Sequence, residues 1–205
     1  MGLYATYVFP ALLDWAMRQK PIRRQREKIV PRARGQVLEI GVGSGLNLPH
    51  YDRTRVAKLY ALDPALGLQQ LARQRAAATE LPIEFLPVSG EAIPLPEDSI
   101  DSIVVTYTLC TIPDVAAALA EMRRVLRPSG TLLFSEHGRA PDADVARWQD
   151  RLNPLWRRLA GGCNLNRRIP ELLEAAGFTL PELSTLYLPG PRLLTFNYWG
   201  AAVRS

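Results

Sequence analysis

Three glycines at alternate positions, Gly41, Gly43 and Gly45, follow the short apolar run 36–40. Glycine permits the left-handed backbone of a tight turn and leaves no side chain between the backbone and a ligand. The turn lacks the small residue that the dinucleotide fingerprint needs where Leu46 stands, and no Gly-Lys-Ser/Thr triplet of a phosphate loop occurs in the chain. It is therefore either a structural βα turn or a turn that binds another ligand through its backbone.

A carboxylate follows the next apolar run, 58–62. It belongs to Asp63, and Pro64 comes directly after it. An acidic residue at this distance from a glycine turn accepts hydrogen bonds from ribose hydroxyls. The alternative is a structural role at a helix start, with Pro64 as the first helical residue. The pairing of Asp63 with the glycine turn favours a nucleoside ligand.

Small and polar residues also follow three later apolar runs. Because the carboxyl ends of parallel strands meet at one edge of a sheet, we expect all of these groups to face one crevice. We expect the residues after the third run, Ser89 to Glu91, to contact an adenine. We expect His137 to act as the general base for an oxygen acceptor, with its imidazole oriented by Glu136. The alternative for His137 is a hydrogen bond to backbone. The residues are Ser89, Gly90 and Glu91, then Thr106, Thr108, Leu109 and Cys110, and last His137.

An alternation of strands and helices must position these groups, and it begins near Gly35. It predicts an α/β fold, a Rossmann-like, seven-stranded, mostly parallel sheet with helices on both faces. Pro128 to Gly130 should end the helix 115–126, and Asn166 should cap the helix 166–176. The expected strands are 36–40, 58–62, 83–88, 100–107, 131–135, 180–188 and 193–203, and the expected helices are 66–79, 115–126, 143–159 and 166–176.

We expect residues 1–34 to form a separate helical segment before the domain of residues 35–205. Its apolar stretch, residues 4–17, is shorter than the ~20 residues that cross a bilayer, and its charges follow the stretch, unlike those of a signal peptide. We weigh two roles for this stretch: a lid that places Tyr4, Tyr7 and Trp15 against a substrate, or core packing. A cytoplasmic location is expected, with contact to the inner membrane surface as a possibility.

The excess of basic over acidic residues lies in residues 18–34. The chain carries a net charge of +5, yet this one segment holds eight basic residues and one acidic residue. Three interpretations remain open: a solvated face, a contact with anionic lipid headgroups and an RNA contact. Nucleic acid is the least expected partner, because the rest of the chain is nearly neutral.

The composition fits one globular domain, with 205 residues of which 47% are hydrophobic. Two cysteines are too few for a disulfide framework, and we expect them to be small buried hydrophobes. Neither they nor the two histidines stand at metal-ligand spacing, so no metal is expected. The oligomeric state is left open.

Several of these segments resemble motifs of one enzyme family. Residues 37–45 are similar to motif I of the class I S-adenosylmethionine-dependent methyltransferases, and Leu62-Asp63 resembles the ribose motif. Residues 90–101 and 121–130 resemble the adenine segment and the fifth-strand signature of the branch called methyltransferase type 11. The resemblance implies S-adenosylmethionine as cofactor, with S-adenosylhomocysteine as product. The implied cofactor-binding residues are Glu39, Gly41, Gly43, Gly45, Asn47, Asp63, Pro64, Ser89, Gly90, Glu91, Thr106, Thr108 and Leu109.

A narrower resemblance concerns the thiol S-methyltransferases of animals. It rests on residues 108–110, 136–137, 153–156 and 161–165. It implies methyl transfer to a small lipophilic acceptor such as a thiol, by in-line displacement, with little need for a base because a thiol has a pKa near ~8.5. The alternatives are a phospholipid-headgroup or quinone methyltransferase at a membrane surface and a non-catalytic cofactor-binding regulator. The expected substrate-binding residues are Tyr4, Tyr7, Trp15, Cys110 and His137.

Overall fold

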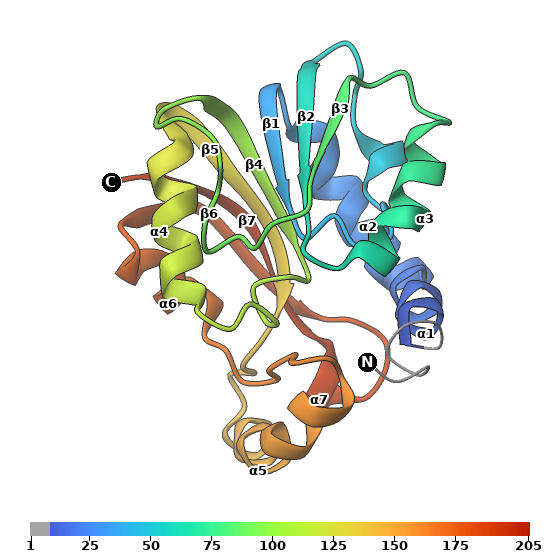
Figure 1. Ribbon diagram of the computed structural model, residues 1–205. Helices are drawn as coiled ribbons and strands as arrows, with labels where there is room; N and C mark the ends of the chain where they lie inside the picture. Colours follow the sequence, from blue (N-terminus) through green and yellow to red (C-terminus); the bar gives the residue numbers. More distant parts are fainter. Residues whose placement is uncertain (1–8) are drawn as a thin grey trace.

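One seven-stranded sheet forms the centre of the molecule, in the order β3-β2-β1-β4-β5-β7-β6 (Figure 1). The computed structural model describes residues 9–205. The predicted Rossmann-like fold is confirmed. The strands are β1 Gly35–Ile40, β2 Val56–Leu62, β3 Ile83–Leu86, β4 Ile100–Thr106, β5 Leu126–His137, β6 Phe178–Tyr187 and β7 Phe196–Arg204. The helices are α1 Phe9–Met17, α2 Lys20–Ile29, α3 Leu66–Ala76, α4 Val115–Val125, α5 Ala143–Leu159, α6 Ile169–Ala175 and α7 Arg192–Thr195, with 3-10 turns η2 Val30–Arg32 and η3 Leu48–His50.

The first five strands run parallel, and β7 runs antiparallel to both β5 and β6. Ile40 of β1 lies opposite Leu62 on one side and Val105 on the other. The strand order reverses between β1 and β4, so the chain leaves these two strands toward opposite sides of the sheet. A crevice opens at such a switch point, beyond the carboxyl ends of the strands.

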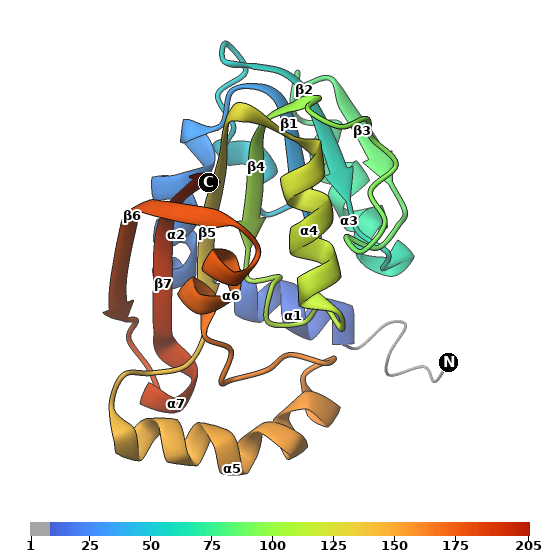
Figure 2. The same ribbon diagram turned by 90° about the vertical axis from the view of Figure 1, so that its left-hand side faces the viewer.

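Helices cover both faces of the sheet because side chains alternate along each strand. Leu38 and Ile40 pack in a core cluster with α4 and α6 on one face. Val37 belongs to a second cluster, with Ile29 of α2 and Ala72 of α3 on the other face. Figure 2 shows α4 and α6 together on one side of the sheet and α2 on the opposite side.

Several predicted boundaries are wrong, and in two cases tertiary contacts override local signals. The strand expected over 193–203 begins at Phe196, because Arg192–Thr195 forms α7, and the strand expected over 83–88 ends at Leu86. Strand β5 begins at Leu126, directly after α4, because Leu126 is extended and pairs with Ile100 ahead of the irregularity around Pro128. Helix α6 begins at Ile169, and Asn166 does not cap it. The Asn166 amide instead donates to Asp150 of α5 at 2.8 Å, a partner that the local sequence does not indicate.

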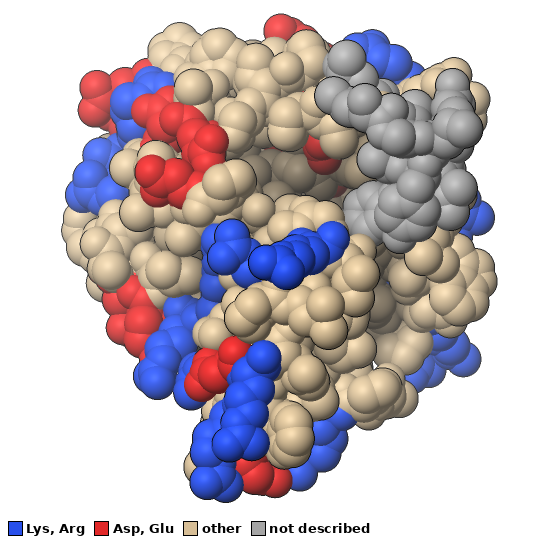
Figure 3. Space-filling view, turned by 60° about the horizontal axis from the view of Figure 1, so that its bottom comes forward, with Lys and Arg blue, Asp and Glu red and all other residues tan. Residues whose placement is uncertain are grey.

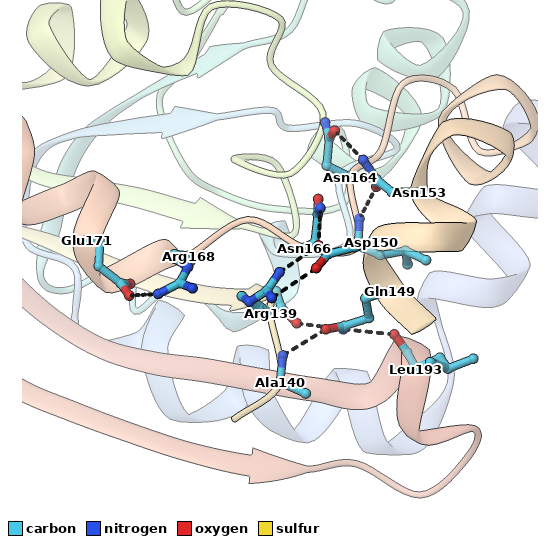
Figure 4. Close-up of polar contacts among 12 residues, drawn as sticks. Arg139, Ala140, Gln149, Asp150, Asn153, Asn164, Asn166, Arg168, Glu171 and Leu193 are labelled. Carbon is cyan, nitrogen blue, oxygen red and sulfur yellow. Dashed lines mark hydrogen bonds and ion pairs between the residues drawn. The ribbon is translucent and has the colours of Figure 1, made fainter. Parts of the chain in front are cut away.

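Helices α1 and α5 lie at the same end of the molecule, where the parallel strands end (Figures 1 and 2). Polar contacts join α5 to the body on one side: Arg139 pairs with Asp150, and Gln149 donates to the Leu193 carbonyl at 3.1 Å (Figure 4). Within residues 9–205, no helix combines the length and the apolar character needed to cross a membrane.

Candidate active site

The glycine turn after β1 has the backbone that the sequence predicts. Gly41, Gly43 and Gly45 all have positive φ, at 74°, 53° and 80°. A Cβ on Gly41 would collide with the side chain of Thr108, and one on Gly45 would lie 2.9 Å from Cα of Ala72. A Cβ on Gly43 would meet nothing nearer than 3.9 Å. Gly41 and Gly45 are therefore needed for packing, whereas the backbone of Gly43 faces open space that a ligand can occupy.

Asp63 lies beside this turn, as predicted. Its Oδ2 accepts a hydrogen bond from the Gly43 N–H at 2.8 Å, and its Oδ1 accepts one from the Ala65 N–H at 2.7 Å. Burial raises the pKa of Asp63, and these two backbone hydrogen bonds oppose the rise. Asp63 thus joins the end of β2 to the turn and stabilises the start of α3, beyond Pro64. The ribose contact stays a prediction.

Glu39 and Asn47 form a buried network beneath the turn. Glu39 Oε1 accepts from Asn47 Nδ2 at 3.0 Å, and Glu39 Oε2 accepts from the Tyr51 hydroxyl at 2.8 Å. Asn47 Nδ2 also donates to Thr106 Oγ1 on β4, at 3.0 Å. Burial raises the pKa of Glu39 to about 7. Three of the predicted cofactor residues therefore connect the ends of β1 and β4.

The predicted adenine segment is held by side chains that leave its backbone available. The Ser89 hydroxyl donates to Glu91 Oε2 at 3.0 Å, and the Asp114 N–H donates to Glu91 Oε1 at 2.7 Å. A Cβ on Gly90 would lie 3.4 Å from the Ile40 side chain. The side chains of Ser89 and Glu91 thus bond to each other and to the start of α4, which favours recognition of a ligand by backbone groups.

An ion pair on α4 explains the spacing of the later motif. Glu121 and Arg124 pair at 2.7 Å. Glu121 accepts from the Ile93 N–H at 2.9 Å, while Arg124 donates to the carbonyls of Ile93 and Leu95 at 2.8 and 2.9 Å. The pair therefore fixes the end of the adenine segment on the sheet edge.

Glu136 does not orient His137 as predicted, because its carboxylate binds backbone groups of the loop after β4. Glu136 Oε1 accepts from the N–H groups of Thr108 and Leu109, at 2.7 and 3.1 Å. Burial raises its pKa to about 7. Adjacent residues of a strand point to opposite faces, so the side chains of Glu136 and His137 diverge. Glu136 holds the loop after β4, and its carboxylate does not serve to orient the imidazole.

The imidazole of His137 lies close to two cysteines. His137 Nε2 is 3.1 Å from Cys163 Sγ, and the ligand atoms of Cys110, His137 and Cys163 all lie within 4.8 Å of one another. Cys110 is buried, and the other two are half-buried. Burial opposes protonation of His137, but its contact with Cys163 and the charge of Glu136 together outweigh this and raise the pKa. Sequence spacing gives no sign of this group, because its members come from three distant segments.

Helix α1 is fixed to the glycine turn by Asp14. Asp14 Oδ1 accepts from Ser44 Oγ at 2.5 Å and from Arg75 of α3 at 2.9 Å. Burial raises the pKa of Asp14, but the hydrogen bonds from Arg75 and Ser44 outweigh it, and the net pKa is lowered. Trp15 is 65% exposed, away from the buried part of the site. Tyr4 and Tyr7 lie outside the described residues.

Arg26 is a site residue that the sequence analysis missed. It is buried, its Nη1 donates to the Met17 carbonyl at 2.9 Å, and its guanidinium lies 5.5 Å from the centre of the Tyr107 ring. Burial lowers its pKa, against the opposing effects of Tyr107 and Glu39. Its sequence neighbours Arg23 and Arg24 are exposed. Arg26 and buried Ile29 are three residues apart, on the same side of an amphipathic helix. This pattern is the signal that could have distinguished Arg26 from the exposed basic residues of segment 18–34.

Several buried polar atoms around the crevice have no hydrogen-bond partner in the part of the chain that the structure describes. They therefore show whether a polar ligand would suit this place. Among residues 9–205, five buried side-chain polar atoms make no hydrogen bond, and four of them surround the ends of β1, β4 and β5. Buried polar groups are normally satisfied, so a polar ligand at this place would find hydrogen-bond partners. Figure 3 shows the same end of the molecule with a hollow in its surface. The four atoms are Arg26 Nε, Asn47 Oδ1, Ser135 Oγ and Glu136 Oε2.

The chain is similar to known proteins of one enzyme class. Residues 38–134 match the model of a methyltransferase domain. The chain is 32% identical to the human thiol S-methyltransferase TMT1A over 179 residues, which are 85% of this chain and 72% of the relative. It is 33% identical to rat thiol S-methyltransferase TMT1B over 72% of this chain, but it spans only 61% of that relative. A S-adenosylmethionine-dependent methyltransferase structure from Aquifex aeolicus superposes with a TM-score of 0.67 at 18% identity, covering 96% of this chain and 98% of that one.

The chain therefore belongs to the class I S-adenosylmethionine-dependent methyltransferases. The predicted family, the predicted enzyme class and the predicted cofactor, S-adenosylmethionine, are confirmed.

Proposed function

We propose that this protein transfers the methyl group of S-adenosylmethionine to a small lipophilic thiol. The observation that carries the proposal is the position of Cys110 and His137 at the ends of β4 and β5, on the edge that carries the glycine turn. His137 Nε2 is engaged with Cys163 Sγ at 3.1 Å and is not free to accept a proton from a substrate hydroxyl. A thiol forms some thiolate at neutral pH without a base, so this environment favours sulfur over oxygen acceptors.

The cofactor would be held by groups from three strand ends and from α2. Asp63 would bind the ribose, and the backbone of Gly90 and Glu91 would contact the adenine. The methionine carboxylate would lie near Gly43 and Arg26, because a planar guanidinium suits a carboxylate and Arg26 Nε is unpartnered. Bound S-adenosylmethionine supplies an electrophilic methyl group on a sulfonium.

The protein's contribution is to hold the acceptor in line with the methyl group. Proximity and orientation supply much of the acceleration in such displacements. Buried Cys110 and half-buried His137 would form the acceptor side of the crevice. Helix α1, fixed through Asp14 to Ser44, would exclude water from the cofactor. With an oxygen acceptor, His137 would have to leave Cys163 before it could act as a base.

A membrane-surface acceptor is the second candidate, and exposed apolar side chains on α5 favour it. Trp148, Leu152, Leu155 and Leu159 are 52%, 37%, 56% and 63% exposed at helical spacing. Their spacing puts them on one side of the helix. Trp15 of α1 is exposed at the same end of the molecule (Figure 2). Such a surface would also deliver a lipophilic acceptor to the crevice, with basic residues of segment 18–34 and α5 contacting anionic headgroups.

A methyl-transfer assay tests the proposed function. Purified protein is incubated with labelled S-adenosylmethionine and a panel of lipophilic thiols, phenols, amines, a demethylated quinone and phosphatidylethanolamine vesicles. We expect turnover with thiols that exceeds turnover with matched phenols. Preferred turnover of the quinone or the phospholipid would replace the thiol by the second candidate. Cofactor binding without turnover of any acceptor would support a non-catalytic regulator.

A further inference from the structure

We propose that Cys110, His137 and Cys163 form a binding site for a soft divalent metal ion of the zinc type, with a fourth coordination position open toward the acceptor. The part of this inference that concerns the acceptor rests on the proposed function. The metal site itself stands on the geometry of the three side chains. Two thiolates and an imidazole are common zinc ligands, and three protein ligands with one open position are typical of catalytic rather than structural zinc.

The three ligand atoms are already close to coordination distance. They lie within 4.8 Å of one another, and the His137–Cys163 pair is at 3.1 Å. In tetrahedral zinc, with Zn–S near 2.3 Å and Zn–N near ~2.1 Å, ligand atoms are roughly 3.5–3.8 Å apart. Small side-chain adjustments would bring all three ligands onto one ion, without movement of the strands.

Hydrogen bonds hold the Cys163 segment against the Cys110 segment. The backbone N–H and the side-chain Nδ2 of Asn164 both donate to the Cys110 carbonyl, at 2.9 and 2.8 Å. Asn153 of α5 holds the same segment, donating to Asn164 Oδ1 at 3.2 Å and accepting from the Leu165 N–H at 2.8 Å (Figure 4). Asn164 is buried. The two cysteines are therefore brought together by hydrogen bonds outside the ligand set, as the partners that orient ligands do in metal sites.

The remaining charges around the group come from the neighbouring loop and strand. Arg167 donates to the carbonyls of Leu109 and Ile112, so it fixes the loop that carries Cys110. Burial lowers the pKa of Arg167. Glu136, on the other face of β5, holds the first part of the same loop. Both side chains serve the backbone, which leaves the two thiols and the imidazole as the ligand set.

The position of the His137 imidazole argues against a disulfide between Cys110 and Cys163 as the function of these three residues. A disulfide requires two cysteines and no third group, whereas His137 lies in direct contact with Cys163. Both cysteines are free in the structure. Metal binding would release the protons of the two thiols to solvent.

The open position would bind the acceptor as a thiolate, with its proton also released to solvent. The thiolate electron pair then forms the new carbon–sulfur bond. The bond from the methyl carbon to the sulfonium sulfur breaks, and its electron pair stays on that sulfur in S-adenosylhomocysteine. The product thioether is a weaker ligand and leaves the metal.

Titration of reduced, metal-free protein with Co²⁺ and Zn²⁺ tests the site. We expect about one equivalent of Co²⁺ to bind, with thiolate-to-cobalt charge-transfer absorption, and Zn²⁺ to displace it. Cys110→Ser and Cys163→Ser should each lower the affinity by at least about tenfold, and Asn164→Ala by roughly tenfold. His50→Ala removes the other histidine of the chain and is the matched control, with unchanged metal affinity.

Binding of S-adenosylmethionine by each variant shows that the protein is folded. Absence of cobalt–thiolate absorption in folded, reduced wild type would overturn the proposal, and so would a metal affinity unchanged by both cysteine variants. A Cys110–Cys163 disulfide formed in air at the same rate with and without Zn²⁺ would also count against it. Metal binding without thiol turnover would retain the site and overturn the proposed acceptor. Thiol turnover at full rate after metal removal would retain the acceptor and overturn the role of the metal.

Discussion

At the residue scale, neighbouring glycines of the turn have different functions although they share one backbone conformation. All three have positive φ, so any side chain there is strained. Gly45 is packed against Ala72, whereas Gly43 faces the open crevice. The sequence pattern alone treats them as equivalent, and only their surroundings separate packing from binding.

Alanine substitution should separate these two roles. Gly43→Ala should lower the free energy of unfolding by only ~1 kcal/mol, the cost of the left-handed backbone, yet lower the affinity for S-adenosylmethionine at least tenfold because the methyl group occupies the ligand's space. Gly45→Ala should be the more destabilising change, because its Cβ meets helix α3. Calorimetric titration and urea unfolding measure both quantities. Equal losses of stability in the two variants would contradict this assignment.

Glu39 should make the stability of the protein depend on pH. Its folded-state pKa is raised to about 7 from 4.5, so the folded state binds this proton more tightly than the unfolded chain does. The stabilising contribution is therefore complete below pH 4.5 and is lost as the pH rises through 7. Relative to Glu39→Gln, wild type should lose about 3 kcal/mol over this window. Urea unfolding at several pH values measures the difference, and a difference independent of pH would exclude buried ionisation of Glu39.

At the element scale, helix α1 is attached to the cofactor edge by one buried carboxylate. Its bounds follow the apolar pattern, but its position follows from Asp14, which bonds to Ser44 and Arg75. Buried ion pairs are sensitive to loss of one partner, because the other charge stays desolvated. That α1 acts as a lid remains a prediction. The contact of Asp14 with Ser44 and Arg75 makes this prediction testable.

Asp14→Asn should loosen α1 from the glycine turn. We expect weaker S-adenosylmethionine binding, by roughly tenfold, and faster protease cleavage within residues 1–34, because Arg75 is left without its carboxylate partner. Glu27→Gln, which removes an exposed partner of Arg23 on α2, is the matched control and should change neither quantity. Unchanged cleavage and affinity in Asp14→Asn would show that α1 is held by other contacts.

At the scale of the whole molecule, the cofactor edge, α1 and α5 lie at one end (Figures 1 and 2). The exposed apolar face of α5 consists of Trp148, Leu152, Leu155 and Leu159. Exposed arginines Arg147, Arg151, Arg157 and Arg158 share the helix. This arrangement would place the crevice toward an anionic lipid surface, so acceptor access and surface binding should be coupled.

Vesicle co-sedimentation tests that arrangement. Wild type should bind phosphatidylglycerol vesicles more strongly than neutral phosphatidylcholine vesicles, and binding should weaken as salt increases. The double substitution Leu155→Gln with Leu159→Gln should lower binding several-fold, because it removes exposed apolar area from α5. Leu183→Gln, on exposed β6, is the matched control. Binding unaffected by the double substitution would exclude α5 as the contact.

The sheet, the glycine turn, the position of Asp63 beside it and the family could all be predicted from the sequence, because these depend on short-range patterns and on which residues follow each strand. Tertiary structure decided what those patterns cannot encode. It placed the Asn166 amide against Asp150 instead of at the start of a helix, and it placed the Glu136 carboxylate against the loop after β4. It also buried Arg26 while its neighbours Arg23 and Arg24 stayed exposed. It brought the side chains of Cys110, His137 and Cys163 close together. These outcomes depend on contacts between segments far apart in the chain, which only the packed sheet and its crossovers bring together.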